Sequence, residues 1–73
     1  MEERFTGKVI FFSAAKGYGF IQQDSGERDL FVHFTGIEAE GYRTLTPSQR
    51  VSYTIVPGRE RRGVMAAEVR IED

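Results

Sequence analysis

Alternating residue types between positions 17 and 33 predict two short strands joined by a polar turn. Successive side chains of a strand point to opposite faces, so every second residue shares a face. In the segments 17–21 and 30–33, one face carries three aromatic rings and an imidazole: Tyr18, Phe20, Phe31 and His33. The other face carries small and aliphatic residues: Gly17, Gly19, Ile21, Leu30 and Val32. The segment 23–28 between them is rich in residues that favour a tight reversal of the chain.

The alternation alone does not decide which face is buried, because aromatic residues in strands more often belong to a core than to an exposed surface. Gly17 and Gly19 favour an interior on their own side. Missing side chains let a neighbouring strand approach closely, as a small closed barrel requires. The rings are then expected outside. Exposed flat rings suit a single-stranded nucleic acid, since every base has a π-face that can stack on an aromatic side chain.

Three further segments read as strands, at 5–13, 50–56 and 64–71. In the first, Gly7 is expected to mark a bulge or bend. The neighbours Phe11 and Phe12 must face opposite ways, unless a local twist brings both to one rim. The last segment also fits a helix by its composition, but its place after a turn and at the end of the chain favours a closing strand. The segment 35–49 reads as a long loop with one helical turn near Glu38.

Five short strands with one long connection after the third describe an all-β fold. We expect a single domain over residues 1–73, built as a five-stranded antiparallel Greek-key barrel, the OB-fold. In that architecture the face of the second and third strands and certain loops bind oligonucleotides. The predicted rings lie on those same two strands, so side-chain alternation and architecture indicate one surface.

Composition and charge narrow the function classes. The chain has no cysteine and one histidine, so we expect neither a disulfide nor a zinc site, and no other metal or cofactor. No apolar run approaches the roughly 20 residues that cross a bilayer, and the polar start is unlike a signal peptide; a cytoplasmic protein without a membrane partner is expected. The net charge of −1 argues against a strongly electrostatic nucleic-acid binder. A locally positive face is still compatible with the positions of Lys8, Lys16, Arg59, Arg61 and Arg62.

Catalysis is not expected. His33 is the only histidine, and its neighbours in the predicted strand pair are aromatic, without a hydroxyl nucleophile. The segment 17–19 begins like a phosphate-binding loop, but Gln22 stands where a glycine is needed and no helix start follows. Asp29 either accepts hydrogen bonds from base amino groups or stabilises the turn that precedes the predicted strand at 30–33. Tyr42 either contacts nucleic acid or pins its own loop to the barrel.

At these residues the chain resembles the cold-shock domain family. The segments 16–21 and 30–34 resemble its two ribonucleoprotein motifs, and the similarity runs from about Phe5 to Ile71. The resemblance implies a five-stranded barrel that binds single-stranded RNA and DNA, commonly as an RNA chaperone or antiterminator. It also implies the nucleic-acid-binding residues, which are Lys8, Phe11, Phe12, Lys16, Tyr18, Phe20, Asp29, Phe31, His33, Phe34, Tyr42 and Arg62.

Two features of this chain differ from simple alternation or from the family pattern. Phe34 breaks the alternation with Phe31 and His33, so only the resemblance places it on the surface. Ile10 and Phe11 stand where the family usually has a lysine just before a tryptophan, which removes one phosphate partner and shrinks one stacking surface. The same mode of binding is expected, with lower affinity.

The sequence therefore predicts a non-enzymatic protein that binds single-stranded RNA and DNA with low sequence specificity, as an RNA chaperone or antiterminator. The alternative hypothesis is a protein-interaction barrel whose aromatic patch docks a partner or a second copy of the chain. We expect a monomer without a small-molecule cofactor, and strand exchange into a dimer stays open.

Overall fold

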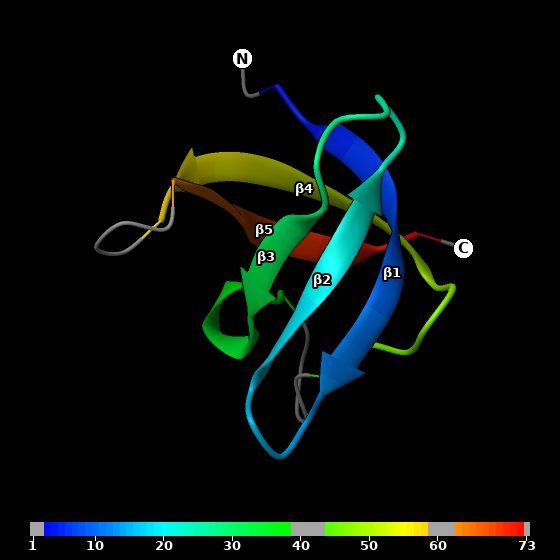
Figure 1. Ribbon diagram of the computed structural model, residues 1–73, viewed down its shortest axis with the longest axis vertical. Helices are drawn as coiled ribbons and strands as arrows, with labels where there is room; N and C mark the ends of the chain where they lie inside the picture. The colour runs from blue at the N-terminus through cyan, green and yellow to red at the C-terminus, as the bar shows by residue number, and fades with distance from the viewer. Residues whose placement is uncertain (1–2, 39–43, 59–62, 73) are drawn as a thin grey trace.

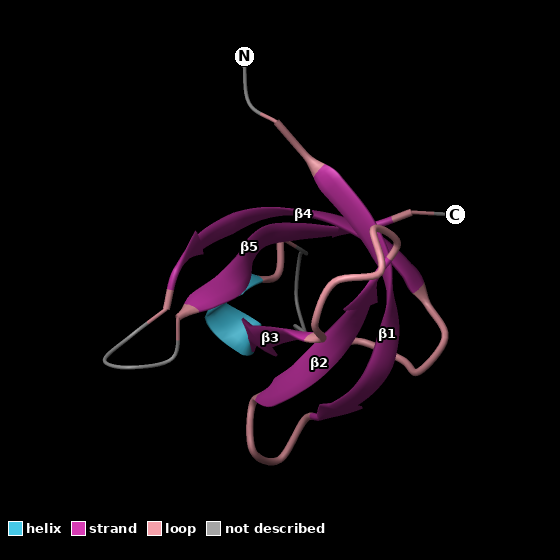
Figure 2. Cartoon of the chain, turned by 45° about the horizontal axis from the view of Figure 1, so that its top comes forward, coloured by secondary structure: helices cyan, strands magenta, loops and turns pink. Residues whose placement is uncertain are grey.

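A computed structural model, which describes residues 3–38, 44–58 and 63–72, shows a closed barrel of five strands (Figures 1 and 2). The strands are β1 (Phe5–Ser13), β2 (Tyr18–Gln23), β3 (Leu30–His33), β4 (Arg50–Pro57) and β5 (Val64–Ile71). The order around the barrel is β1-β2-β3-β5-β4, and β4 pairs with β1 to close it. The all-β barrel is thereby confirmed. One pair departs from the antiparallel expectation, because β3 and β5 run parallel.

The interior of the barrel is aliphatic, on the side where the sequence places its glycines. Gly19 shows why this side is inside: a Cβ there would lie 2.2 Å from the carbonyl oxygen of Phe11 on β1, so only glycine lets the two strands approach this closely. Gly17 does not open β2 as expected but precedes it, in a turn with a φ of +81°. The buried core consists of Val9, Ile21, Leu30, Val32, Ile37, Leu45, Val51, Tyr53, Ala66 and Val69.

A bulge in β1 changes which side chains face outward. The register between β1 and β2 shifts between Val9 and Phe11, so Ile10 is an extra residue there. Val9 is buried, Ile10 and Phe11 are both exposed, and Phe12 packs partly buried against the core. The prediction that Phe11 and Phe12 face opposite ways is confirmed. The expectation that Gly7 marks the bulge is wrong, since Gly7 is buried and paired in regular register.

The segment 64–71 is strand β5, so the helical alternative for it is wrong. Glu68 interrupts its regular geometry with a φ of 49°.

The helical turn expected near Glu38 lies earlier in the chain, as the 3-10 turn η1 (Phe34–Gly36). Ile37 then forms an isolated bridge with Val69, which attaches this segment to β5. Within the described ranges, no helix has the length and apolar character needed to cross a membrane.

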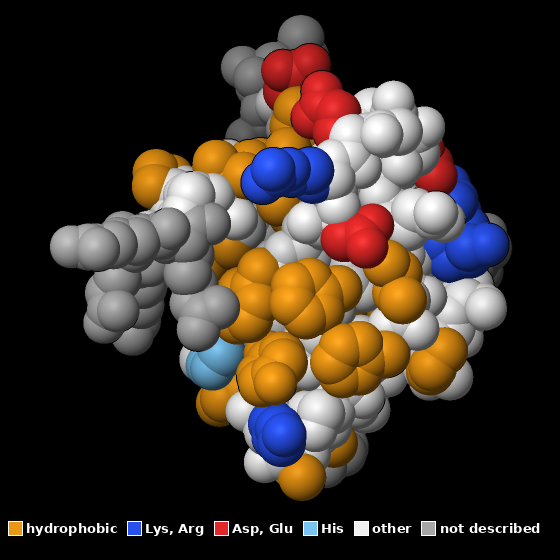
Figure 3. All heavy atoms as spheres, viewed as in Figure 1, with side chains coloured by type: hydrophobic (Ala, Val, Ile, Leu, Met, Phe, Trp, Pro, Cys, Tyr) orange, Lys and Arg blue, Asp and Glu red, His pale blue; other side chains and the backbone are white. Residues whose placement is uncertain are grey.

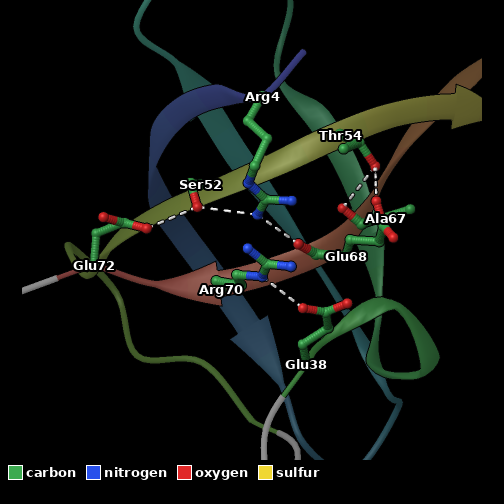
Figure 4. A network of polar contacts seen from close by, with 8 residues as sticks. All are labelled: Arg4, Glu38, Ser52, Thr54, Ala67, Glu68, Arg70 and Glu72. Carbon is green, nitrogen blue, oxygen red and sulfur yellow. Dashed lines mark hydrogen bonds and ion pairs between the residues drawn. The ribbon is translucent and has the colours of Figure 1, made fainter. Parts of the chain in front are cut away.

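A polar network over β4 and β5 ties the start of the chain to its end (Figure 4). Arg4 donates from Nη2 to Ser52 Oγ at 3.0 Å and to the carbonyl oxygen of Glu68 at 2.7 Å. Ser52 Oγ in turn donates to Glu72 Oε2 at 2.8 Å. These contacts hold the segment before β1 against the last two strands.

Asp24 fastens the turn after β2 to β1 and β4. It forms a two-point ion pair with the guanidinium of Arg50 and accepts a hydrogen bond from Thr6 Oγ1 at 2.7 Å. The hydrogen bonds from Arg50 and Thr6 lower the pKa of Asp24 to about 2.

Tyr53 is held by hydrogen bonds inside the barrel. Its hydroxyl lies 3.2 Å from both the Thr6 carbonyl oxygen and Gln23 Oε1. Burial, as the largest cause, raises the pKa of Tyr53 to about 12.

Candidate nucleic-acid interface

Rings from three adjacent strands lie together on the outside of the barrel, where Figure 3 shows them as a contiguous orange cluster. The ring of Phe20 lies 5.9 Å from that of Phe11 and 5.9 Å from that of Phe31, and the rings of Tyr18 and Phe31 are 5.7 Å apart. These centroid distances fall in the range at which aromatic rings contact one another. We call Phe11, Tyr18, Phe20, Phe31 and His33 the aromatic face.

The register of the strands explains why these rings meet. Phe11 pairs with Phe20, and Phe20 pairs with Phe31, which makes one row across three strands. Tyr18 pairs with His33 in the next row. Directly opposite residues have Cβ atoms about 4.5–5.5 Å apart, so large side chains in one row touch. The bulge in β1 is a condition for this arrangement, because without the extra residue Phe11 would take the inward position.

The aromatic face is on the solvent side of the sheet. Phe11 is 40% exposed, and the other members of the face are half-buried, each covered in part by its neighbours. Ile21 and Val32, which alternate with the rings along β2 and β3, are both 0% exposed. The prediction that the rings point outward and the aliphatic residues inward is therefore confirmed.

Phe34 adds a ring at the edge of the aromatic face, where its centroid lies 4.7 Å from that of His33. The backbone N–H of Thr35 donates to His33 Nδ1 at 3.3 Å, and Thr35 Oγ1 lies 2.9 Å from the same nitrogen. Because Nδ1 accepts, we assign the proton of the neutral ring to Nε2, where it is available as a donor.

Phe34 is 41% exposed and begins the turn η1, where strand alternation no longer applies. Gly17 makes room for it, since a Cβ at Gly17 would lie 2.9 Å from Phe34 Cδ1. Alternation could not have found Phe34, and only the resemblance pointed to it. In the structure it extends the set of exposed rings past the end of β3.

Charged side chains border the aromatic face. Lys8 on β1, Lys16 in the turn between β1 and β2, and Asp29 just before β3 are all exposed. In the part of the chain that the structure describes, none of these three side chains has a hydrogen bond or an ion pair. They are therefore available to a ligand on the aromatic face. Among the same residues, no three His, Asp or Glu side chains gather in a group that could hold a metal ion.

Three of the predicted binding residues do not join this set. Phe12 packs against the core, on the opposite side of β1 from Phe11. Tyr42 and Arg62 lie outside the described residues.

Met65 is a neighbour of the aromatic face that the sequence reasoning missed. It pairs with Phe31 in the parallel register of β3 and β5, while the next pair, Val32 with Ala66, is buried in the core. Met65 therefore points outward beside Phe31, half-buried. Its position depends on which strand lies next to β3, and no local pattern in the sequence carries that information.

The chain is similar in sequence to known proteins. The sequence profile of the "'Cold-shock' DNA-binding domain" matches residues 5–71. The chain is 48% identical over 69 residues to the "Cold shock-like protein CspA" of Vibrio cholerae, covering 94% of this chain and 96% of that protein. It is 52% identical over 63 residues to the "Cold shock protein CspB" of Bacillus caldolyticus, covering 86% of this chain and 91% of that protein.

Among solved structures, the chain is similar to "drosophila Unr CSD456", with a TM-score of 0.79 over 99% of this chain. The sequence identity is 21%, so this likeness concerns the fold alone. The match spans 28% of that longer chain.

Proposed function

The chain belongs to the "'Cold-shock' DNA-binding domain" family, whose members bind nucleic acid and are not enzymes, and from this premise we propose that it binds single-stranded RNA and DNA by base stacking. The observation that carries the proposal is the aromatic face, with its rings in contact with each other and open to solvent. Each stacked base contributes about 1–3 kcal/mol. Several rings can therefore supply affinity at a net charge of −1, and they do so with little sequence preference.

We further propose a cellular role as an RNA chaperone or antiterminator in the cytoplasm. A base that stacks on the aromatic face has left the stack of bases in a paired helix. Binding along a transcript therefore opposes the formation of hairpins, and sequence tolerance lets one protein act on many transcripts.

Substitution of single rings tests the stacking mechanism. Phe20→Ala and Phe31→Ala should each weaken binding of oligo-dT by about 5- to 150-fold, the equivalent of roughly 1–3 kcal/mol per base. The affinity is measured by fluorescence anisotropy of a labelled oligonucleotide. Ile71→Ala is the matched control, because Ile71 is a large apolar side chain of 43% exposure outside the aromatic face. Thermal melting of each variant separates loss of binding from loss of fold.

Two outcomes would contradict stacking. Equal losses from Ile71→Ala and from the ring variants would mean that the rings have no special part. A loss from Lys16→Ala as large as that from Phe20→Ala would mean that phosphate contacts dominate the affinity.

A second candidate function is a protein-interaction barrel, and the exposed apolar side chains around the aromatic face favour it. Ile10 and Phe34 are 43% and 41% exposed, so the apolar area extends beyond the rings. Sedimentation at rising protein concentration, with and without oligo-dT, separates the two candidates. Nucleic-acid binding predicts a monomer that gains the mass of the oligonucleotide. A docking barrel predicts self-association, or no change with oligonucleotide.

A further inference from the structure

Met65 on β5 borders the aromatic face on the side away from β2. Strands β3 and β5 run side by side, and Met65 pairs with Phe31 in their parallel register (Figure 1). The rings of Tyr18 and Phe20 lie against Phe31 from β2, at centroid distances of 5.7 and 5.9 Å. Neighbouring strands are about 4.8 Å apart, so the long side chain of Met65 is within contact distance of the Phe31 ring from the β5 side. Met65 thus ends the registered row that begins at Phe11.

The side chain of Met65 is accessible from solvent. It is half-buried and points outward, because the next residue, Ala66, is 0% exposed and faces the core. The residue before it, Val64, is 52% exposed, and its partner on β4, Val56, is half-buried. A small neutral oxidant therefore reaches the side chain of Met65 without any opening of the barrel.

The chain offers few other sulfur atoms to such an oxidant. It contains two methionines and no cysteine. Exposed thiolates are the usual targets of hydroperoxides in proteins, and none competes here. Met1 lies outside the described residues, so Met65 is the only thioether in the part of the chain that the structure describes. Oxidation at sulfur in this part falls on a residue that borders the proposed binding surface.

We propose that Met65 is a site of reversible oxidation by hydroperoxides, which weakens the binding of single strands; this inference rests on the proposed function. The sulfur attacks one oxygen of hydrogen peroxide, so that an S–O bond forms and the O–O bond breaks. Sulfur is oxidised and the peroxide is reduced by the same electron pair. The proton of the transferred oxygen moves to the other oxygen, which leaves as water. The product is methionine sulfoxide, which sulfoxide reductases return to the thioether.

Oxidation changes what Met65 offers to a bound strand. The thioether is apolar and polarizable, and it packs favourably beside an aromatic ring. The sulfoxide oxygen is a hydrated acceptor, and covering it without a hydrogen-bond donor costs free energy. A strand that rests on Phe31 and Met65 must displace this water. Oxidation therefore opposes binding, while the buried positions of Ile21 and Val32 in the core are left unchanged.

Peroxide treatment followed by an affinity measurement tests the inference. The wild-type protein is incubated with hydrogen peroxide, and peptide mass spectrometry locates the added oxygen. The affinity for labelled oligo-dT, measured by fluorescence anisotropy, should fall about fourfold or more, as for the loss of one apolar contact of methylene size. A sulfoxide reductase with dithiothreitol should restore the affinity.

Two variants serve as controls. Met65→Leu keeps a large apolar side chain and retains Met1, so peroxide should leave its affinity unchanged. Met65→Gln has a polar side chain of similar length, and it should bind as weakly as the oxidised protein without any peroxide. Thermal melting of each sample separates loss of binding from loss of fold.

Protection by the ligand gives a second measurement. A strand that covers Met65 shields its sulfur, so saturating oligo-dT should slow the oxidation of Met65. Free methionine in the same solution gives the reference rate and reports any consumption of peroxide by the oligonucleotide. An oxidation rate that oligo-dT leaves unchanged relative to this reference would place Met65 outside the bound surface and overturn the inference.

Four further results would overturn it. Met65 that is oxidised without loss of affinity would show that the sulfoxide does not oppose binding. An equal loss in peroxide-treated Met65→Leu would place the sensitive group elsewhere. Met65 that stays unoxidised while free methionine reacts would show that its sulfur is inaccessible. Loss of the thermal transition on oxidation would mean that weaker binding reflects unfolding. If the untreated wild-type protein does not bind oligo-dT, the proposed function itself fails, which is distinguishable from binding that peroxide leaves unchanged.

Discussion

Replacing Ile10 by lysine should strengthen the binding of single strands. Ile10 is the bulge residue of β1, directly before Phe11, and it is 43% exposed. A lysine at this place keeps its ammonium group in water at the border of the aromatic face, where it can contact a phosphate of a strand that stacks on the rings as proposed. The change is tolerated by the fold, because an exposed strand position changes stability by about 1 kcal/mol at most.

The size of the effect follows from the release of counterions. For single strands, each neutralised phosphate changes the slope of log K against log salt by about −0.7. One new contact therefore raises affinity by about fivefold at a salt concentration of about 0.1 M, and it makes the slope steeper by about 0.7. The formal net charge rises at the same time from −1 to zero.

Fluorescence anisotropy with labelled oligo-dT at several salt concentrations gives both the affinity and the slope. Ile71→Lys is the matched control, because Ile71 has the same 43% exposure and lies at the end of β5, outside the aromatic face. It makes the same change in net charge, and salt at about 0.1 M screens exposed charges beyond about 10 Å. An equal gain in affinity from both variants would show that the affinity depends on the net charge of the protein alone. An unchanged or weakened affinity in Ile10→Lys would refute the expectation that a phosphate of the bound strand comes within reach of position 10.

The remaining predictions concern stability. Gly19→Ala should lower the free energy of unfolding by about 1–3 kcal/mol or more, because the added Cβ would lie 2.2 Å from the carbonyl oxygen of Phe11; an unchanged urea midpoint would contradict this packing. Asp24 has a pKa lowered from 3.8 to about 2 by Arg50 and Thr6, so its ion pair should stabilise the fold above about pH 3.8, and this contribution should be lost as the pH falls toward about 2. Urea midpoints across this range should therefore fall further in the wild type than in Asp24→Asn, and parallel curves would show that another group is responsible.

Local sequence patterns were sufficient to predict the strands and the outward position of most of the aromatic rings. The first and last predicted strands, 5–13 and 64–71, coincide with β1 and β5. The alternation put Tyr18 and Phe20 on one face of β2, and the glycines on the opposite face indicated that the rings lie outside. These predictions succeed because alternation and turn residues act over a few neighbouring positions. The bulge is different, since Ile10 resembles any strand residue and becomes an extra residue only through its pairing with β2.

The rest of the site depends on contacts between segments far apart in the chain. Met65 joins the surface because β5 lies parallel to β3, and the sequence around Met65 does not indicate that neighbour. Phe34 is exposed because the chain turns at η1 as soon as β3 ends.

Among the residues that the structure describes, the junction between β3 and β5 is the shortest in the barrel wall, with two registered pairs where the other junctions have four or six. One of those two pairs joins Phe31 to Met65, so the outer surface of this junction is part of the proposed ligand platform. A nucleic-acid strand that rests on both side chains, as the proposed function implies, holds β3 and β5 together from outside. A ligand that binds only the closed barrel stabilises it by mass action, so bound nucleic acid is expected to oppose opening of this junction.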